Sequence, residues 1–474
     1  MAYRGILGLV ILGCFLGRFG VEDKLLSVAL DITAIIASYT FLTYSTKKSG
    51  YRYAPPYLVY AVGFVVAAVG VALFVEATHP IGIFAGWEMV SMAGWGLIAF
   101  GHRVSKRSLE AAFIAFLTNR LGDAFWLTGV FSGAFPAGVW ISVLIKAGIF
   151  PFTFWLVQAM IAPAPVSALL HSALLVGMAV YLPIRYPDFV RSPLPDWGQT
   201  AVWIASLGAS LGAVFSRSPK VTLAWTTSAH LGIALYLVSQ PALALSYLIH
   251  HSYLKAALFL LLDLARKGKG FSLTLTLLWW LASALLFVSE AAADQKLLPV
   301  EFISAIALGQ AWARTTYNQS GEKFPLAELV VSVLIFLAAF HMKGLSWQGM
   351  LSLAGLLIGA WRPMPMKLRL DIPAVRIMQI SLKGWTYLSQ WACKVERQLN
   401  MIVERIARKF IAIGNASVQI ESLLVQRGWP QAAQAVRQGL ASLSGNTHQQ
   451  AYVQALRWSF LLTLIIGMAW KLLR

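Results

Sequence analysis

The chain has 474 residues, of which 58% are hydrophobic and only 12% are charged, whereas about a quarter of a soluble globular protein is charged. This composition excludes an ordinary soluble domain and predicts a protein folded within a lipid bilayer. The net charge of +19 does not indicate nucleic-acid binding, because most cations stand in short loops between apolar runs or in one C-terminal stretch, as membrane topology requires.

The apolar runs predict an all-α, polytopic membrane protein. A helix needs about 20 apolar residues to cross a hydrocarbon core of roughly 30 Å, and an open sheet would leave backbone groups unpaired in lipid. About 14 to 15 runs satisfy this length criterion. They lie near residues 4–20, 25–44, 56–77, 81–100, 110–135, 138–158, 165–184, 198–215, 221–239, 242–265, 271–290, 297–314, 325–342, 346–361 and 457–473.

The charges of the loops predict one topology. Four loops are basic, and the helix order places all four on the same face as the N-terminus. These loops cover residues 47–52, 102–107, 216–220 and 266–269. The loops between them at 78–80, 136–137 and 240 have no Lys or Arg. Because cytoplasmic loops are rich in Lys and Arg, the basic face is expected to be the cytoplasmic side of a bacterial inner membrane.

The C-terminal region follows a different pattern. From 374 to 424, apolar residues such as Leu399, Ile402, Ile406 and Phe410 recur every three or four positions with basic residues between them. This stripe predicts a long lateral amphipathic helix, either a simple surface helix or a brace along neighbouring helices or subunits. The expected regions are N-terminal helices (1–77), a conducting core (78–362), the lateral helix with a polar linker (363–456) and a final transmembrane helix (457–474).

The two cysteines, Cys14 and Cys393, are far apart and cannot form a C-x-x-C metal site or the ligand set of an iron–sulfur cluster. The chain has no G-x-G-x-x-G motif after a strand and no haem-binding signature. We therefore expect no cofactor in this chain, and we expect that it is not itself catalytic.

Ionisable residues within the apolar spans are the functional candidates, because each costs several kcal/mol in lipid unless it is paired or hydrated. The first are Glu88, Arg120, Asp123 and Lys146, and the three-residue spacing of Arg120 and Asp123 puts both on one helix face. These four form either static ion pairs between helices or switchable proton-holding groups. The later candidates are His171, His230, His250, His251, Lys255, Asp263, Glu290, Asp294 and Lys296.

Several motifs resemble signatures of the antiporter-like, proton-conducting subunits of the complex I superfamily. From Lys146 to His171 the sequence is KAGIFPFTFWLVQAMIAPAPVSALLH, a lysine followed by a proline-broken helix and a W-L-x-x-A-M-x-x-P-x-P-V-S-A-L-x-H run. The motifs G-W-E at 86–88 and N-R-x-G-D at 119–123 precede it in the family's order. The segments KVTLAWTTSAHLG from Lys220 and HSYLKAALF from His251 resemble two further signatures.

The resemblance implies a role for each matching position. Glu88 would modulate a channel lysine at Lys146, Arg120 and Asp123 would be their polar neighbours, and His171 would be a relay. Lys220, His251 and Lys255 would lead to a second half-channel that ends at Lys296. The family fold contains two inverted repeats with broken helices, and Pro151 fits the first break.

Some positions depart from the family pattern. Trp225 replaces the usual tyrosine, His230 replaces a glutamine, and Leu297 stands where an acidic residue is expected. The chain is also shorter than the largest respiratory members. These features resemble DabB-type subunits, which pair with a zinc-containing, carbonic-anhydrase-like DabA subunit to accumulate dissolved inorganic carbon. Alternatives are a proton-pumping subunit of NADH-quinone oxidoreductase and an Mrp-type or membrane-hydrogenase relative. A redox enzyme or a passive membrane anchor would be different classes of protein.

Overall fold

The computed structural model describes residues 2–18, 21–44, 57–101, 104–132, 137–190, 194–216, 218–268, 270–287, 296–315, 325–341 and 347–361. Their regular structure is helical, with no β-strand among these residues. The prediction of an all-α, polytopic membrane protein is confirmed. Both the predicted lateral helix and the final predicted span lie outside the described residues.

The α-helices in chain order are α1 (Ala2–Arg18), α2 (Lys24–Tyr44), α3 (Tyr57–Glu76), α4 (Pro80–Phe100), α5 (Lys106–Leu127), α6 (Ala137–Lys146), α7 (Thr153–Gln158), α8 (Ala164–His171), α9 (Met178–Arg185), α10 (Pro187–Val190), α11 (Asp196–Phe215), α12 (Pro219–Tyr236), α13 (Pro241–Lys267), α14 (Leu273–Phe287), α15 (Leu298–Ala313), α16 (Pro325–Phe340) and α17 (Trp347–Trp361). Two π-helical turns, η1 (Thr128–Ser132) and η3 (Ala173–Gly177), and two 3-10 turns, η2 (Ala159–Ile161) and η4 (Leu237–Ser239), extend or interrupt them.

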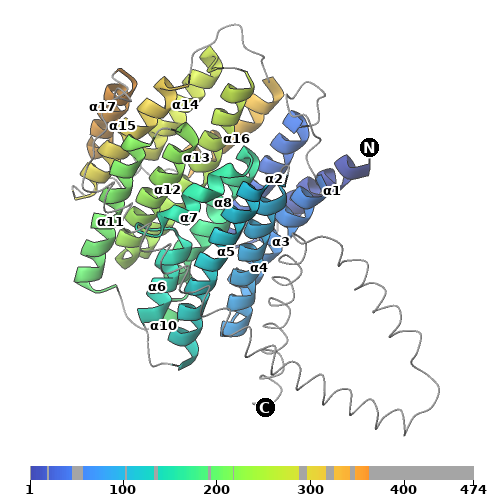
Figure 1. Cartoon of the computed structure of the whole chain (residues 1–474), viewed down its shortest axis with the longest axis vertical. Coiled ribbons are helices and arrows are strands. Elements are labelled where there is room, and N and C mark those ends of the chain that lie inside the picture. The colour runs from blue at the N-terminus through green and yellow to red at the C-terminus, as the bar shows by residue number, and fades with distance from the viewer. Residues whose placement is uncertain are drawn as a thin grey trace, which may run out of the picture. The chain divides into compact units, whose positions relative to one another are not determined.

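Each of the first fourteen predicted spans coincides with one helix or with a broken helix. By length and composition, seven helical stretches within the described residues are long and apolar enough to cross a membrane, and five further apolar helices are shorter. In Figure 1, α1–α4 lie on one side of α13, whereas α11, α15 and α17 lie on the other. α13 has 27 residues, and its most apolar stretch is entirely buried, so it is the central helix of this unit.

Two predicted spans are broken near the centre of the unit. α6 ends at Lys146, and α7 begins only at Thr153, after a turn that contains Pro151. Gly148 has a φ of +63°, a left-handed conformation that favours glycine. The second break separates α8 from α9 through the π-helical turn η3, a type of irregularity that is frequent at functional sites.

Three tyrosine hydroxyls bond helix α2 and its N-terminal end to the rest of the unit. Tyr39 donates to Asp263 at 2.7 Å, and Tyr253 donates to Asp31 at 2.7 Å. These two bonds are reciprocal, since α2 and α13 each supply one donor and one acceptor. Tyr181 on α9 donates to Asp23 at 2.6 Å. Each carboxylate also lies within 4.0 Å of a cation, which reduces the cost of its burial. The three cations are Lys267, Arg18 and Arg185.

Glycine allows α3 and α4 to approach closely beside the predicted site. A Cβ atom at Gly86 would overlap the backbone of Phe74 and Gly70 on α3, whereas one at Gly96, on the same helix, would meet nothing within 4 Å. The close approach fixes the height and rotation of α4, which carries Glu88.

We predict that Gly86→Ala lowers the melting temperature of the detergent-solubilised protein, because overpacking against backbone costs about 1–3 kcal/mol. Gly96→Ala is the matched control, since both changes raise helix propensity equally. The steric argument fails if the two variants melt at the same temperature.

Candidate functional site

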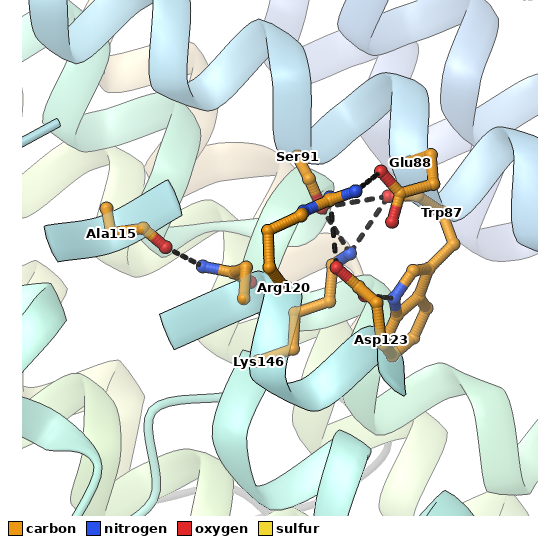
Figure 2. A network of polar contacts seen from close by, with 8 residues as sticks. Trp87, Glu88, Ser91, Ala115, Arg120, Asp123 and Lys146 are labelled. Carbon is orange, nitrogen blue, oxygen red and sulfur yellow. Dashed lines mark hydrogen bonds and ion pairs between the residues drawn. The ribbon is translucent and has the colours of Figure 1, made fainter. Parts of the chain in front are cut away.

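Helices α4, α5 and α6 bring Glu88, Arg120, Asp123 and Lys146 into one buried cluster, which Figure 2 shows from close by. Glu88 comes from the middle of α4. Arg120 and Asp123 share a face of α5, as their spacing predicts, and Lys146 is the last residue of α6. A lysine at this position faces the negative end of the helix dipole. The break after α6 therefore places a cation inside the bundle.

Arg120 links the two carboxylates. Its guanidinium forms ion pairs with Glu88 and, at 2.9 Å, with Asp123. The side chains of Glu88 and Arg120 are 18% and 24% exposed, whereas that of Asp123 is 5% exposed. A guanidinium stays protonated at any physiological pH, so Arg120 is a fixed charge between two groups that can take up a proton.

Lys146 does not form an ion pair with Glu88 or Asp123. Its ammonium group donates to the backbone carbonyl of Trp87 at 2.9 Å and to Ser91 Oγ at 2.5 Å, and it lies 3.9 Å from the centre of the Trp87 ring. Lys146 is only 1% exposed. The structure thus brings the expected partners Glu88 and Lys146 into one network, with other groups between them.

Trp87 connects the lysine to the carboxylates. Its indole Nε1 donates to Asp123 Oδ1 at 2.7 Å, while its carbonyl accepts from Lys146. From the sequence, Trp87 was noted only as part of the G-W-E motif, and Ser91 had no predicted role. The available signal was the helical spacing, because Ser91 lies four residues after Trp87 and three after Glu88 and so shares a helix face with each.

A proton can move from one group of the cluster to another without a change in the total charge of the cluster. Two carboxylates face two cations, so the formal charges of Glu88, Asp123, Arg120 and Lys146 cancel. A small cavity of about 10 Å³ adjoins the cluster, and its lining includes Ser91, Asn119 and Arg120. This volume corresponds to about one water molecule, which could hydrogen-bond to these groups.

Two other predicted lysines, Lys220 and Lys255, donate hydrogen bonds to uncharged oxygen atoms. Lys220, on α12, donates to the carbonyls of Met160, at 2.9 Å, and Ala162, at the end of turn η2. Lys255, on α13, is fully buried and donates to Thr226 Oγ1. Neither lysine forms an ion pair among the described residues. The dipoles of backbone carbonyls and of a hydroxyl group stabilise these two charges, whereas carboxylates lie near Lys146.

The predicted histidines His171, His230, His250 and His251 are all buried. His171 ends α8 beside the second helix break and packs on Phe259, with 5.0 Å between the ring centres. His251 lies 5.9 Å from His230, again between ring centres. Lys296 differs from all of these residues, because it precedes α15 in a turn and its side chain is exposed. Two further candidates, Glu290 and Asp294, lie outside the described residues. The described site residues are buried except for Glu88 and Arg120, which are partly exposed, and Lys296, which is exposed.

One buried acidic residue was not among the residues predicted from the sequence. Glu301, in the first turn of α15, is completely buried, and neither carboxylate oxygen has a hydrogen-bond partner among the described residues. The criterion that selected Glu88, a lone carboxylate in an apolar span, would also have selected it.

Comparisons with known proteins agree with the sequence motifs. Residues 135–288 match the family model described as NADH:quinone oxidoreductase/Mrp antiporter, TM. This stretch contains Lys146, His171, Lys220, His251 and Lys255 but neither Glu88 nor Lys296.

Two relatives are subunits of quinone oxidoreductases. The chloroplastic NAD(P)H-quinone oxidoreductase subunit 5 of Nephroselmis olivacea is 30% identical over 50% of this chain and 42% of its own length. The NADH-quinone oxidoreductase subunit L of Campylobacter jejuni is 31% identical over 39% of this chain and 36% of its own length. The matches therefore cover less than half of either relative.

A solved structure of the Mrp complex from Dietzia sp. contains a chain with the same fold. The match covers 99% of this chain and 63% of that chain, with a TM-score of 0.50 and 18% identity. The family model and the two relatives are therefore similar to part of this chain, and the solved structure shows a similar fold. The narrower resemblance to DabB-type subunits rests on the sequence alone.

We predict that Glu88→Gln and Arg120→Gln are strongly non-additive in thermal stability. Removing one partner leaves an uncompensated buried charge, which costs about 3–5 kcal/mol, whereas the double variant removes both charges of the pair. Although Asp123 remains in the double variant, its melting temperature should exceed that of Arg120→Gln alone. Arg107→Gln, at an exposed position of α5, is the control and should melt like the wild type. Additive losses would show that the pair is not coupled.

Proposed function

We propose that this chain is a proton-conducting, antiporter-like subunit of a multisubunit membrane complex. The observation that carries the proposal is the buried network of Glu88, Arg120, Asp123 and Lys146, formed by three membrane helices. The match of residues 135–288 supports it, because the matching family is that of NADH:quinone oxidoreductase and Mrp antiporter membrane regions.

The network supplies a switch of suitable energy. Two unit charges 4 Å apart interact by about 4 kcal/mol at an effective dielectric constant of 20. Moving one charge through a membrane potential of 100 mV is worth about 2.3 kcal/mol. The two energies are of the same order, so a change of partner by Arg120 can alter the protonation of Lys146 under a physiological driving force.

A proton step starts at Lys146. If Arg120 turns from Glu88 toward Asp123, the negative charge nearest the lysine changes, and so does the preference of its ammonium group for its proton. Ser91 Oγ accepts a hydrogen bond from Lys146 and can pass the proton on, because a hydroxyl is both donor and acceptor. Arg120 keeps its own protons throughout.

The second half of the proposed path runs along α13. Lys255 and His251 lie on this helix, and the proposed relay His171 packs against its Phe259. Neutral imidazole rings can accept a proton at one nitrogen and donate at the other. This part of the path therefore depends on histidines and on water, and not on ion pairs.

The relatives favour a subunit of a quinone oxidoreductase or of an Mrp-type complex over one of an inorganic-carbon complex. Accumulation of dissolved inorganic carbon with a DabA-type zinc partner is the second candidate. The exposed Lys296 and the replacement of the following acidic residue by Leu297 favour it, since the end of the path departs from the respiratory pattern. A bacterial inner membrane is the proposed location in either case.

We predict that Glu88→Gln and Lys146→Met each lower proton flux at least tenfold in proteoliposomes containing the purified complex. Each change removes a protonatable group while the bundle still inserts. A pH-sensitive dye inside the vesicles measures the flux, and Arg107→Gln is the control. Wild-type flux in both variants would contradict a role of this pair in conduction.

The candidate partner complexes predict different cellular phenotypes. For an inorganic-carbon complex, co-expression with a DabA-type partner should restore growth of a carbonic-anhydrase-deficient bacterium in air, and an uncoupler should abolish carbon uptake. Co-purification identifies the partner directly. Quinone-linked proton pumping without a carbon phenotype would assign the chain to a respiratory complex, and carbon uptake that persists without a proton gradient would exclude proton coupling.

A further inference from the structure

Glu301 is a carboxylate enclosed by protein on all sides. Its side chain is 0% exposed, and both of its oxygens lack a hydrogen-bond partner among the described residues. Within the same described ranges, the other buried carboxylates, Asp123 and Asp263, each accept a tyrosine or tryptophan hydrogen bond and lie beside a cation. Glu301 thus occupies a different kind of environment.

Helix geometry does not account for the burial of this charge. Glu301 lies in the first turn of α15, where the helix dipole favours a carboxylate. This stabilisation is smaller than the cost of removing an ion from water, even after relaxation of the protein. The remaining cost disappears when the carboxyl group carries a proton, so the position suits a group that takes up and releases one.

Helix α12 lies between the lysine of α13 and Glu301, because it packs against both α13, which carries Lys255 and Tyr247, and α15, which carries Glu301. The ring of Tyr247 meets that of His230 edge-on, with 6.4 Å between centres, and His230 meets His251 in the same way at 5.9 Å. His251 and Lys255 lie four residues apart on α13 and therefore share one face of that helix.

These side chains are open to further hydrogen bonds. The Tyr247 hydroxyl and both ring nitrogens of His230 are buried and, like the carboxylate of Glu301, have no hydrogen-bond partner within the described part of the chain. So many unfilled polar groups in one region are rare in proteins, and ordered water commonly fills them. Water among these side chains would complete a hydrogen-bonded path from α13 across α12 to α15.

The position of Glu301 is held firmly. Ser210 on α11 donates to the backbone carbonyl of Val300 at 3.1 Å and lies 2.9 Å from Ser304 Oγ. These contacts bind the first turn of α15 to α11 on either side of Glu301 in the sequence. In contrast, Lys296 lies in the turn before α15 with its side chain exposed.

We propose that Glu301, reached through His230 and Tyr247, is the proton-accepting group that ends the second half of the path in this chain, in place of Lys296. The inference rests on the proposed function, since it assigns an end to the same path. It also gives His230 and Tyr247 a shared role as links between Lys255 and the carboxylate.

The test compares Glu301→Gln with Lys296→Gln in the purified complex in proteoliposomes. Glutamine keeps the shape of the buried side chain but cannot take up a proton, so Glu301→Gln should lower proton flux at least tenfold. Lys296→Gln should leave flux within twofold of the wild type. Wild-type flux in Glu301→Gln, or a tenfold loss in Lys296→Gln alone, overturns the proposal.

A second measurement tests the proposal if the complex with Glu301→Gln does not assemble. Dicyclohexylcarbodiimide reacts with protonated carboxyl groups in apolar surroundings, and mass spectrometry of the wild-type complex then locates the modified residue. Modification of Glu301 that slows flux supports the proposal, whereas an unmodified Glu301 at full inhibition overturns it. If Glu88→Gln and Lys146→Met lose flux while Glu301→Gln does not, only this inference fails; if the wild type carries no protons, the proposed function fails.

Discussion

The cost of placing a charge in lipid governs the rest of this structure. Each ionisable group in a span must find a counter-charge, a dipole or a water molecule, and the bundle supplies these in different ways. Arg120 holds both Glu88 and Asp123, so two carboxylates and two cations share one pocket between α4, α5 and α6. Their charges cancel, and the network is stable while its protons stay movable.

Broken helices provide backbone dipoles that stabilise buried lysines without an ion pair. The end of α6 receives Lys146, and the carbonyls after α7 receive Lys220. In a continuous helix these carbonyls would bond to the next turn and would be closed to a side chain. The breaks therefore create binding sites for cations in the middle of a membrane protein, where the alternative partner would be lipid.

The two halves of the proposed path differ in chemistry. Around Lys146 the path consists of fixed opposite charges, which respond to a field by exchanging partners. Around Lys255 it consists of hydroxyl and imidazole groups with unfilled hydrogen bonds, and it approaches the lone carboxylate of Glu301. The first half is suited to sensing charge and the second to carrying protons through water. Such a division would let one subunit couple proton movement to a partner.

The sequence alone determined the membrane class, the helix positions and most of the buried site, because apolar length and rare intramembrane charges are local properties. Pro151 marked one helix break, and the spacing of Arg120 and Asp123 fixed their common face. Only the tertiary structure decided which side chains contact one another. Arg120 lies between the two carboxylates, Trp87 lies beside Lys146, and the side chain of Lys296 is exposed. It also showed that Glu301 is fully buried, with no hydrogen-bond partner for its carboxylate among the described residues. These outcomes depend on how far each helix is rotated and shifted against its neighbours, and no stretch of sequence encodes that by itself.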